Sequence, residues 1–301
     1  MSTAKGVTMT AYTVAIDDTT AAWRTVDWIA DAVDPATDSV RLLTVSEYTG
    51  EALERSEERL EAAEQRLRST HAELTVRHDV TGGPTVDRLV SDAASGDVLV
   101  IGGNQVHTFV AAARGRVAER VVAHAVTPVV VVPEHWERSD GPVVVGVDGR
   151  SASAALSWAA DRAARGRHEL ALVRAWAVPS AVDAYAAVYL QEDRDLWSKE
   201  ADLELRAALR AVGAAQPGLH VTGEAVEGQA RDVVLRSSRG ASLVVVGRRH
   251  RTALGGFITG SVGERLMHEG HAPVCIVPEP TDTGAGTESE RRPEQLHAEV
   301  R

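Results

Sequence analysis

Short apolar runs alternate with amphipathic stretches along most of the chain. Near the C-terminal end, two runs rich in β-branched residues, Leu243–Val246 and Val274–Val277, enclose a glycine-containing loop and a segment with helical spacing, Val262–His268. Continuous apolar runs of this length are typical of strands that are buried on both faces of a sheet. The stretch therefore predicts a strand, a glycine loop, the N-terminus of a helix and a second strand.

The same stretch occurs twice in the chain. Residues 98–133 align with residues 243–278 at a constant offset and without a gap. The matched positions include Gly102 with Gly247, Gly115 with Gly260, and Pro133 with Pro278. Glycines and prolines that stay in step over such a length indicate an internal repeat of a whole domain.

Each half alternates strands and helices through five strands. Besides the strand that opens each repeat, strands are expected at 12–16, 40–45, 74–80, 129–132, 142–147, 170–176, 220–226 and 274–277. A long helix is expected near Leu190–Val212. This alternation predicts an α/β fold in which each half is a doubly wound, five-stranded parallel sheet with helices on both faces.

The length of 301 residues accommodates two such domains. We predict a flexible N-terminus at 1–10, a first domain at 11–133, a linker at 134–141 and a second domain at 142–279. Residues 280–301 are rich in Thr, Glu, Gly and Arg with few apolar residues, so a disordered tail is expected.

Composition narrows the class of partner. The formal net charge of −11 argues against nucleic acid, whose phosphate backbone requires a basic surface. No apolar run reaches the length of a transmembrane helix, and the N-terminus lacks the plan of a signal peptide. The single cysteine, Cys275, lies in a predicted buried strand and fits a reducing compartment. We therefore expect a cytoplasmic protein with no membrane or nucleic-acid partner.

The glycine loop of the second half is the best candidate for chemistry. The start of a helix has free backbone N–H groups and a positive dipole end, which suit a phosphate. The loop also faces the carboxyl end of the sheet, where open α/β sheets bind ligands. Arg248, Arg249 and Arg251 either attract phosphate there or form a solvated basic loop. His268 and His271 are interpreted as surface histidines, and no metal site is predicted.

The spacing Gly247, two residues, His250, nine residues, Gly260 and Ser261 resembles the motif of ATP-binding universal stress proteins. That family carries a glycine where this chain has His250. The run 143–159 looks like the first strand and helix of the family, with its aspartate at Asp148, and 170–176 looks like its second strand. The resemblance covers roughly residues 10–280. It implies the strand order 3-2-1-4-5 in each half and a pseudo-dimer in which the halves pair through their last strands.

The resemblance also implies a nucleotide site in the second half. Asp148 and the backbone of Ala175 would lie near the adenine and ribose, and Val246 and Gly247 would flank the base and sugar. His250 would either crowd the loop or offer a cation to a phosphate. The phosphates would be held by Gly260, Ser261 and Val262.

A weaker second site is implied in the first half, where an empty or altered site is expected. Gln105 replaces the middle glycine and Arg116 replaces the serine. The positions that match the second half, or replace its residues, are Asp17, Val45, Gly102, Gly115 and Arg116.

These features predict a tandem universal stress protein that binds ATP or another adenine nucleotide mainly in its C-terminal domain, with or without Mg²⁺. It would act as a regulatory stress-response module, with no tightly bound organic cofactor and at most weak hydrolysis. A homodimer of chains is an open alternative to the intrachain pseudo-dimer alone. The alternative functions are an interaction protein of the family's non-binding branch and a slow ATPase or adenylyl transferase.

Overall fold

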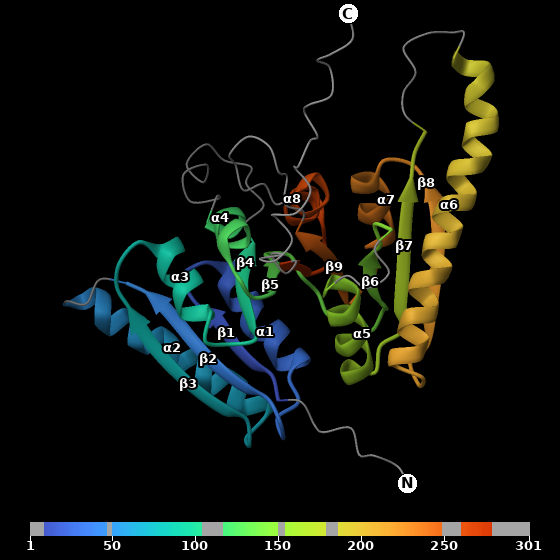
Figure 1. The fold of residues 1–301 in the computed structure, drawn as a ribbon. Coiled ribbons are helices and arrows are strands. Elements are labelled where there is room, and N and C mark those ends of the chain that lie inside the picture. The colour runs from blue at the N-terminus through green and yellow to red at the C-terminus, as the bar shows by residue number, and fades with distance from the viewer. Residues whose placement is uncertain are drawn as a thin grey trace, which may run out of the picture.

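The computed structural model describes residues 9–46, 50–103, 117–149, 154–178, 186–248 and 260–278. The strands in these ranges form one ten-stranded sheet in the order β3-β2-β1-β4-β5-β10-β9-β6-β7-β8 (Figure 1). Strands β5 and β10 pair antiparallel, and the other recorded neighbours pair parallel. The predicted α/β class is confirmed, because each half is a parallel sheet with helices.

The first half comprises β1 (Ala11–Ala15), α1 (Thr20–Ala32), β2 (Ser39–Val45), α2 (Glu51–Thr70), β3 (Thr75–Thr81), α3 (Thr85–Ala93), β4 (Val98–Gly103), α4 (Val117–His124) and β5 (Val129–Pro133). The second half comprises β6 (Val143–Gly146), α5 (Ala154–Gly166), β7 (Leu170–Trp176), α6 (Ala186–Ala215), β8 (Val221–Glu227), α7 (Ala230–Ser237), β9 (Leu243–Arg248), α8 (Gly260–Glu269) and β10 (Val274–Pro278). Numbered within its own half, each set of strands has the order 3-2-1-4-5 that the resemblance implies.

Two apolar layers cover the sheet, one on each face. Alternate strand residues enter opposite layers, as period-two geometry requires: Val98 and Val100 face one layer, and Leu99 and Ile101 face the other. The first layer contains residues of α1, α2, α5 and α6, and the second contains residues of α3, α4, α7 and α8. Both layers therefore run through both halves.

The halves join through their last strands. Cys275 of β10 lies opposite Val130 of β5, and Val274 lies opposite Val131, all of them buried. This pairing, which we call the seam, gives each apolar edge strand a partner. The predicted polar linker also packs against the protein, because its Trp136 is buried in the first layer.

At the start of the chain, Thr10 is buried and its amide donates to Asp38 Oδ1 at 3.0 Å. Order therefore begins before β1, within the stretch that the sequence assigns to a flexible N-terminus. Residues 1–8 and the predicted disordered tail 280–301 lie outside the described residues.

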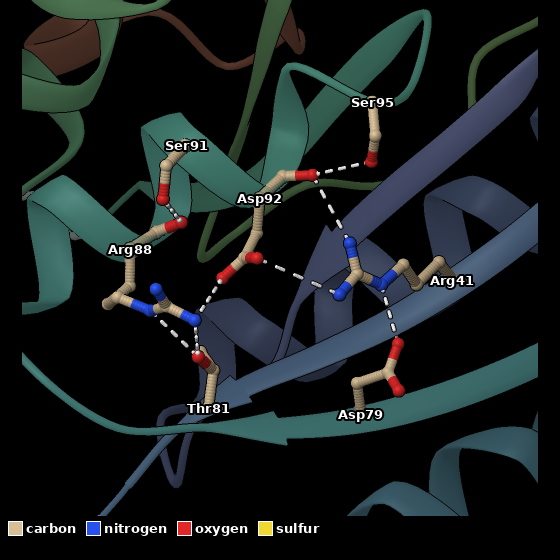
Figure 2. Close-up of polar contacts among 7 residues, drawn as sticks. All are labelled: Arg41, Asp79, Thr81, Arg88, Ser91, Asp92 and Ser95. Carbon is tan, nitrogen blue, oxygen red and sulfur yellow. Dashed lines mark hydrogen bonds and ion pairs between the residues drawn. The ribbon is translucent and has the colours of Figure 1, made fainter.

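Arg41 fixes α3 to the sheet in the first half (Figure 2). Its Nε donates to Asp79 Oδ2 of β3 at 2.6 Å, and its Nη1 donates to the Asp92 carbonyl of α3 at 3.2 Å. Arg88 of α3 donates to Thr81 Oγ1 at the end of β3, so that helix is tied to the strands at both ends.

Candidate functional site

A cavity of about 300 Å³ opens in the first half, at the carboxyl ends of β1, β2 and β4. Strands β1 and β4 are neighbours at the point where the strand order reverses. In open α/β sheets ligands bind at this switch point. Residues that line the cavity include Ile16, Asp17, Val45, Thr85, Gly102 and Val117. The structure thus brings together Asp17, Val45 and Gly102, three of the residues predicted for the weaker site.

Asp17 organises the start of α1 beside this cavity. Its Oδ1 accepts hydrogen bonds from the amide of Thr19 at 2.9 Å and from the Thr19 hydroxyl at 2.6 Å. The Thr19 hydroxyl oxygen accepts in turn from the amide of Ala22 at 3.2 Å, which is an ordinary N-cap. Asp17 therefore orients the N-cap of α1, in addition to any contact that it makes with a ligand.

Gly102 is required where β4 meets α1. A Cβ at this position would lie 2.8 Å from the carbonyl carbon of Ala21 and 3.0 Å from the amide nitrogen of Ala22. The sequence motif identifies a position that needs a small residue. The neighbour that imposes this requirement in the structure is the backbone of α1.

The second half places its predicted residues at the corresponding edge. Asp148 follows β6, Ala175 lies near the end of β7, and Val246 and Gly247 lie near the end of β9. These strands are adjacent in the order β9-β6-β7. Helix α8 begins at Gly260 with Val262 in its first turn.

The first turn of α8 packs over β9. A Cβ on Gly263 would lie 3.9 Å from Val246 Cγ2, which is ordinary contact distance. The start of α8 is thereby held over the strand end that carries Gly247. Of the remaining predicted residues, Gly115, Arg116 and His250 lie outside the described residues, and the side chain of Ser261 is not described.

An ion pair that the sequence did not indicate lies beside the second-half residues. Arg174 Nε lies 2.5 Å from Glu204 Oε2, and Arg174 Nη1 donates to the Ala175 carbonyl. Glu204 also approaches Gly149, where a Cβ would lie 2.5 Å from Glu204 Oε1. The sequence did not indicate this contact, because Glu204 on α6 lies 55 positions after Gly149 along the chain.

Two residues that the sequence suggested as possible ligand-binding residues make other contacts in the structure. Arg248, considered as a phosphate-attracting residue, is buried and donates to carbonyls of α4 and the residue that follows it. His268 Nε2 lies 2.7 Å from Glu119 Oε1, so this histidine joins α8 to α4 across the seam. Within the described ranges, no group of three or more His, Cys, Asp or Glu could hold a metal ion, and no helix is long and apolar enough to cross a membrane.

Comparison with known proteins places this architecture in a family. The model of the universal stress protein family matches residues 12–133 and 141–278, one match in each half. The chain belongs to the universal stress protein family. A relative in Mycobacterium tuberculosis strain H37Rv, universal stress protein Rv2623, is 31% identical over 213 residues, which is 68% of this chain and 69% of the relative.

One solved structure in the universal stress protein family matches the fold over nearly the whole chain. A universal stress protein from Archaeoglobus fulgidus DSM 4304 aligns with a TM-score of 0.63 at 17% identity, covering 91% of this chain and 97% of that chain. Another, solved in complex with cAMP, covers 42% of this chain and 97% of its own, with a TM-score of 0.35 and 23% identity.

Proposed function

We propose that this universal stress protein binds ATP or another adenine nucleotide at the carboxyl edge of its sheet. It acts as a regulatory stress-response module, in which occupancy changes the conformation or the partners of the chain. The observation that carries this proposal is the cavity of about 300 Å³ at the switch point of the first half. Its volume is at the lower end of the range for small-molecule sites, about 300–1,000 Å³.

The second half supplies the principal site. Asp148, Ala175 and Gly247 lie near adjacent strand ends, and α8 begins at Gly260. The orphaned amides at the start of this helix would hold the phosphates. The first-half cavity is the weaker site, because Arg116 stands where the second half has Ser261. The bound nucleotide is used as a signal, with at most slow hydrolysis and with or without Mg²⁺.

The test is calorimetric titration of ATP into the Gly260→Glu variant. A carboxylate at the start of α8 would repel the phosphates and block their approach to the backbone, so binding at the second-half site should be abolished. Gly213→Glu is the matched control, since Gly213 is an exposed residue of α6 where an added Cβ would meet nothing within 4 Å. The assignment of the principal site to the second half is wrong if Gly260→Glu binds ATP as tightly as the control does, and the proposed function is wrong if the parent protein binds no adenine nucleotide.

A second candidate is an interaction protein that binds no nucleotide. It is favoured by the hydrogen bond from Arg174 to the Ala175 carbonyl, which occupies one backbone group assigned to the ligand. Mass spectrometry of small molecules released from the purified protein separates the two functions. Retained adenine nucleotide supports the proposed function, whereas its absence together with no thermal shift in millimolar ATP supports the interaction protein.

A further inference from the structure

Two buried arginines of the second half donate to carbonyls at helix C-termini in the first half. Arg248, at the end of β9, is 8% exposed. Its Nη1 lies 2.7 Å from the Val122 carbonyl oxygen, 3.2 Å from that of Ala123 and 2.6 Å from that of Ala125. These carbonyls belong to the last turn of α4 and the residue just beyond it.

Arg162 makes the corresponding contact on the other face of the sheet. It lies on α5, is 9% exposed, and donates from Nη1 to the Ala32 carbonyl at the end of α1 at 3.1 Å. Its guanidinium carbon also lies 5.9 Å from the centre of the Trp28 ring, within cation–π range. One arginine from the second half thus reaches one helix of the first half on each face.

These contacts are favourable because of what a helix C-terminus offers. The last carbonyls of a helix have no intrahelical partner, and the macrodipole is negative there. Burial of a guanidinium is otherwise costly, and burial lowers the pKa of Arg248. Arg248 Nε is itself buried with no hydrogen-bond partner among the described residues, so these residues do not offset the whole desolvation cost of the guanidinium.

The opposite ends of the same two helices line the first-half cavity. From α1, the N-cap residue Thr19 and Ala22 line the cavity, and from α4, Val117 and Ala118 line it. The helices have 13 and 8 residues, so about 20 Å and 12 Å separate the arginines from the cavity along the two axes. Holding the C-terminus of such a short rigid element fixes the position of its N-terminus.

We propose that Arg162 and Arg248 are positioning residues for the ligand of the first-half cavity. They hold α1 and α4 so that the helix N-termini face an anion, and they neutralise the negative ends of both dipoles, which would otherwise oppose the positive ends. This inference rests on the proposed function, because the anion is taken to be the phosphate portion of an adenine nucleotide.

These two arginine positions make contacts from the second half to the first half, but the equivalent positions of the first half cannot make them in return. At the repeat offset, the first-half counterpart of Arg248 is Gly103, and the counterpart of Arg162, aligned through Trp28 and Trp158, is Ala32. Neither counterpart has a side chain that can donate a hydrogen bond. The second half therefore shapes the first-half site without a reciprocal contact from these positions, and the two sites should respond differently to loss of the arginines.

Hydrogen exchange read by mass spectrometry, with and without millimolar ATP, tests on the full chain whether Arg162 and Arg248 position α1 and α4 for the ligand. Protection of residues 19–23 and 117–121 reports the first cavity, and protection of residues 260–266 reports the second-half site. Arg162→Met and Arg248→Met should lose ATP-dependent protection at the first two stretches and keep it at the third. The control is Arg55→Met, because Arg55 Nε also donates to a carbonyl, that of Glu51, but within its own exposed helix.

Arg248→Lys adds a readout that a general loss of stability would not reproduce. It keeps the charge at the end of α4 without the guanidinium fork, and it should restore part of the protection at 19–23 and 117–121. It also serves as the test if Arg248→Met does not fold. Full protection of the first cavity in the folded arginine variants would overturn the inference, and so would protection of 260–266 alone in the parent protein. Absence of protection at all three stretches in the parent would overturn the proposed function as well.

Discussion

At the scale of single residues, Gly102 is the position where the cavity and the packing of α1 are most tightly linked. In Gly102→Ala the new methyl would press on the Ala21–Ala22 backbone, which cannot rotate away as a side chain can. We expect a loss of about 1–3 kcal/mol in the free energy of unfolding, measured by urea denaturation.

The same substitution at Gly213 is the control for Gly102→Ala. Gly213 is exposed in the last turn of α6, so alanine there should increase stability by up to about 0.5–1 kcal/mol through its higher helix propensity. The same Gly→Ala change is therefore expected to lower the free energy of unfolding at position 102 and to raise it at position 213. Equal urea midpoints for the two variants would show that Gly102 does not limit the approach of α1 to β4.

Sequence reasoning identified residues whose role depends on their neighbours along the chain and missed those whose partners are remote. The glycine spacing singled out Gly102 and Gly247 correctly as strand-end positions. It grouped Arg248 with the loop arginines, because nothing in the local sequence indicates that its acceptors lie more than 120 positions earlier. Arg174 and Glu204 went unnoticed for the same reason.

At the scale of elements, α3 forms one wall of the first cavity through Thr85 and Leu89, and Arg41 ties it to the sheet (Figure 2). Arg41→Met would remove the donor to the Asp79 carboxylate and one of the donors to the Asp92 carbonyl, which would keep its hydrogen bond from the Ser95 hydroxyl. Because the arginine side chain is only 18% exposed, we expect a loss of about 1–3 kcal/mol in unfolding free energy.

Arg68→Met is the control for Arg41→Met. Arg68 pairs with Glu64 four residues earlier at 2.7 Å, but its side chain is 46% exposed. A surface pair of this kind contributes about 0.5 kcal/mol or less, so thermal or urea unfolding should separate the two variants clearly. Similar losses would mean that Arg41 is only another surface ion pair.

The elements themselves were predictable because their apolar periodicity is strong, and their ends were less so. Helix α6 was expected near Leu190–Val212, before Gly213, but it spans Ala186–Ala215. A single glycine inside a helix costs only about 1 kcal/mol, which the packing of α6 on β7 and β8 can offset (Figure 1). The helix instead ends shortly before Pro217, because the residue before a proline is disfavoured in the helical conformation.

At the scale of the whole molecule, the repeat predicts two equal halves and the structure joins them unequally. The β5–β10 seam pairs equivalent strands, as the family resemblance implies, but buried arginines of the second half contact the first half with no counterpart in return. The repeat in the sequence could not reveal this, since it describes what the halves share. The differences between repeats, such as Gly103 against Arg248, carry the information about how the halves act on each other.

Cys275 offers a direct measurement of whether the seam opens. It is fully buried in β10 opposite Val130, and burial raises the pKa of its thiol well above the ordinary value, so little reactive thiolate is present while the seam is closed. Val131→Asp would place a carboxylate in the seam opposite Val274, where an unpaired charge is strongly unfavourable. Labelling of Cys275 by a thiol reagent should accelerate by about tenfold for each 1.4 kcal/mol that the closed seam loses.

Val126→Asp is the matched control for the seam variant, because Val126 is 69% exposed and should tolerate the charge. Far-UV circular dichroism under the labelling conditions separates local opening of the seam from global unfolding. With secondary structure retained, fast labelling in Val131→Asp alone would mean that the halves separate as folded units. If Val131→Asp is labelled no faster than Val126→Asp, the antiparallel pair is not what protects the thiol. Protection would then have to come from the helix layers, and the two halves would unfold as one cooperative body.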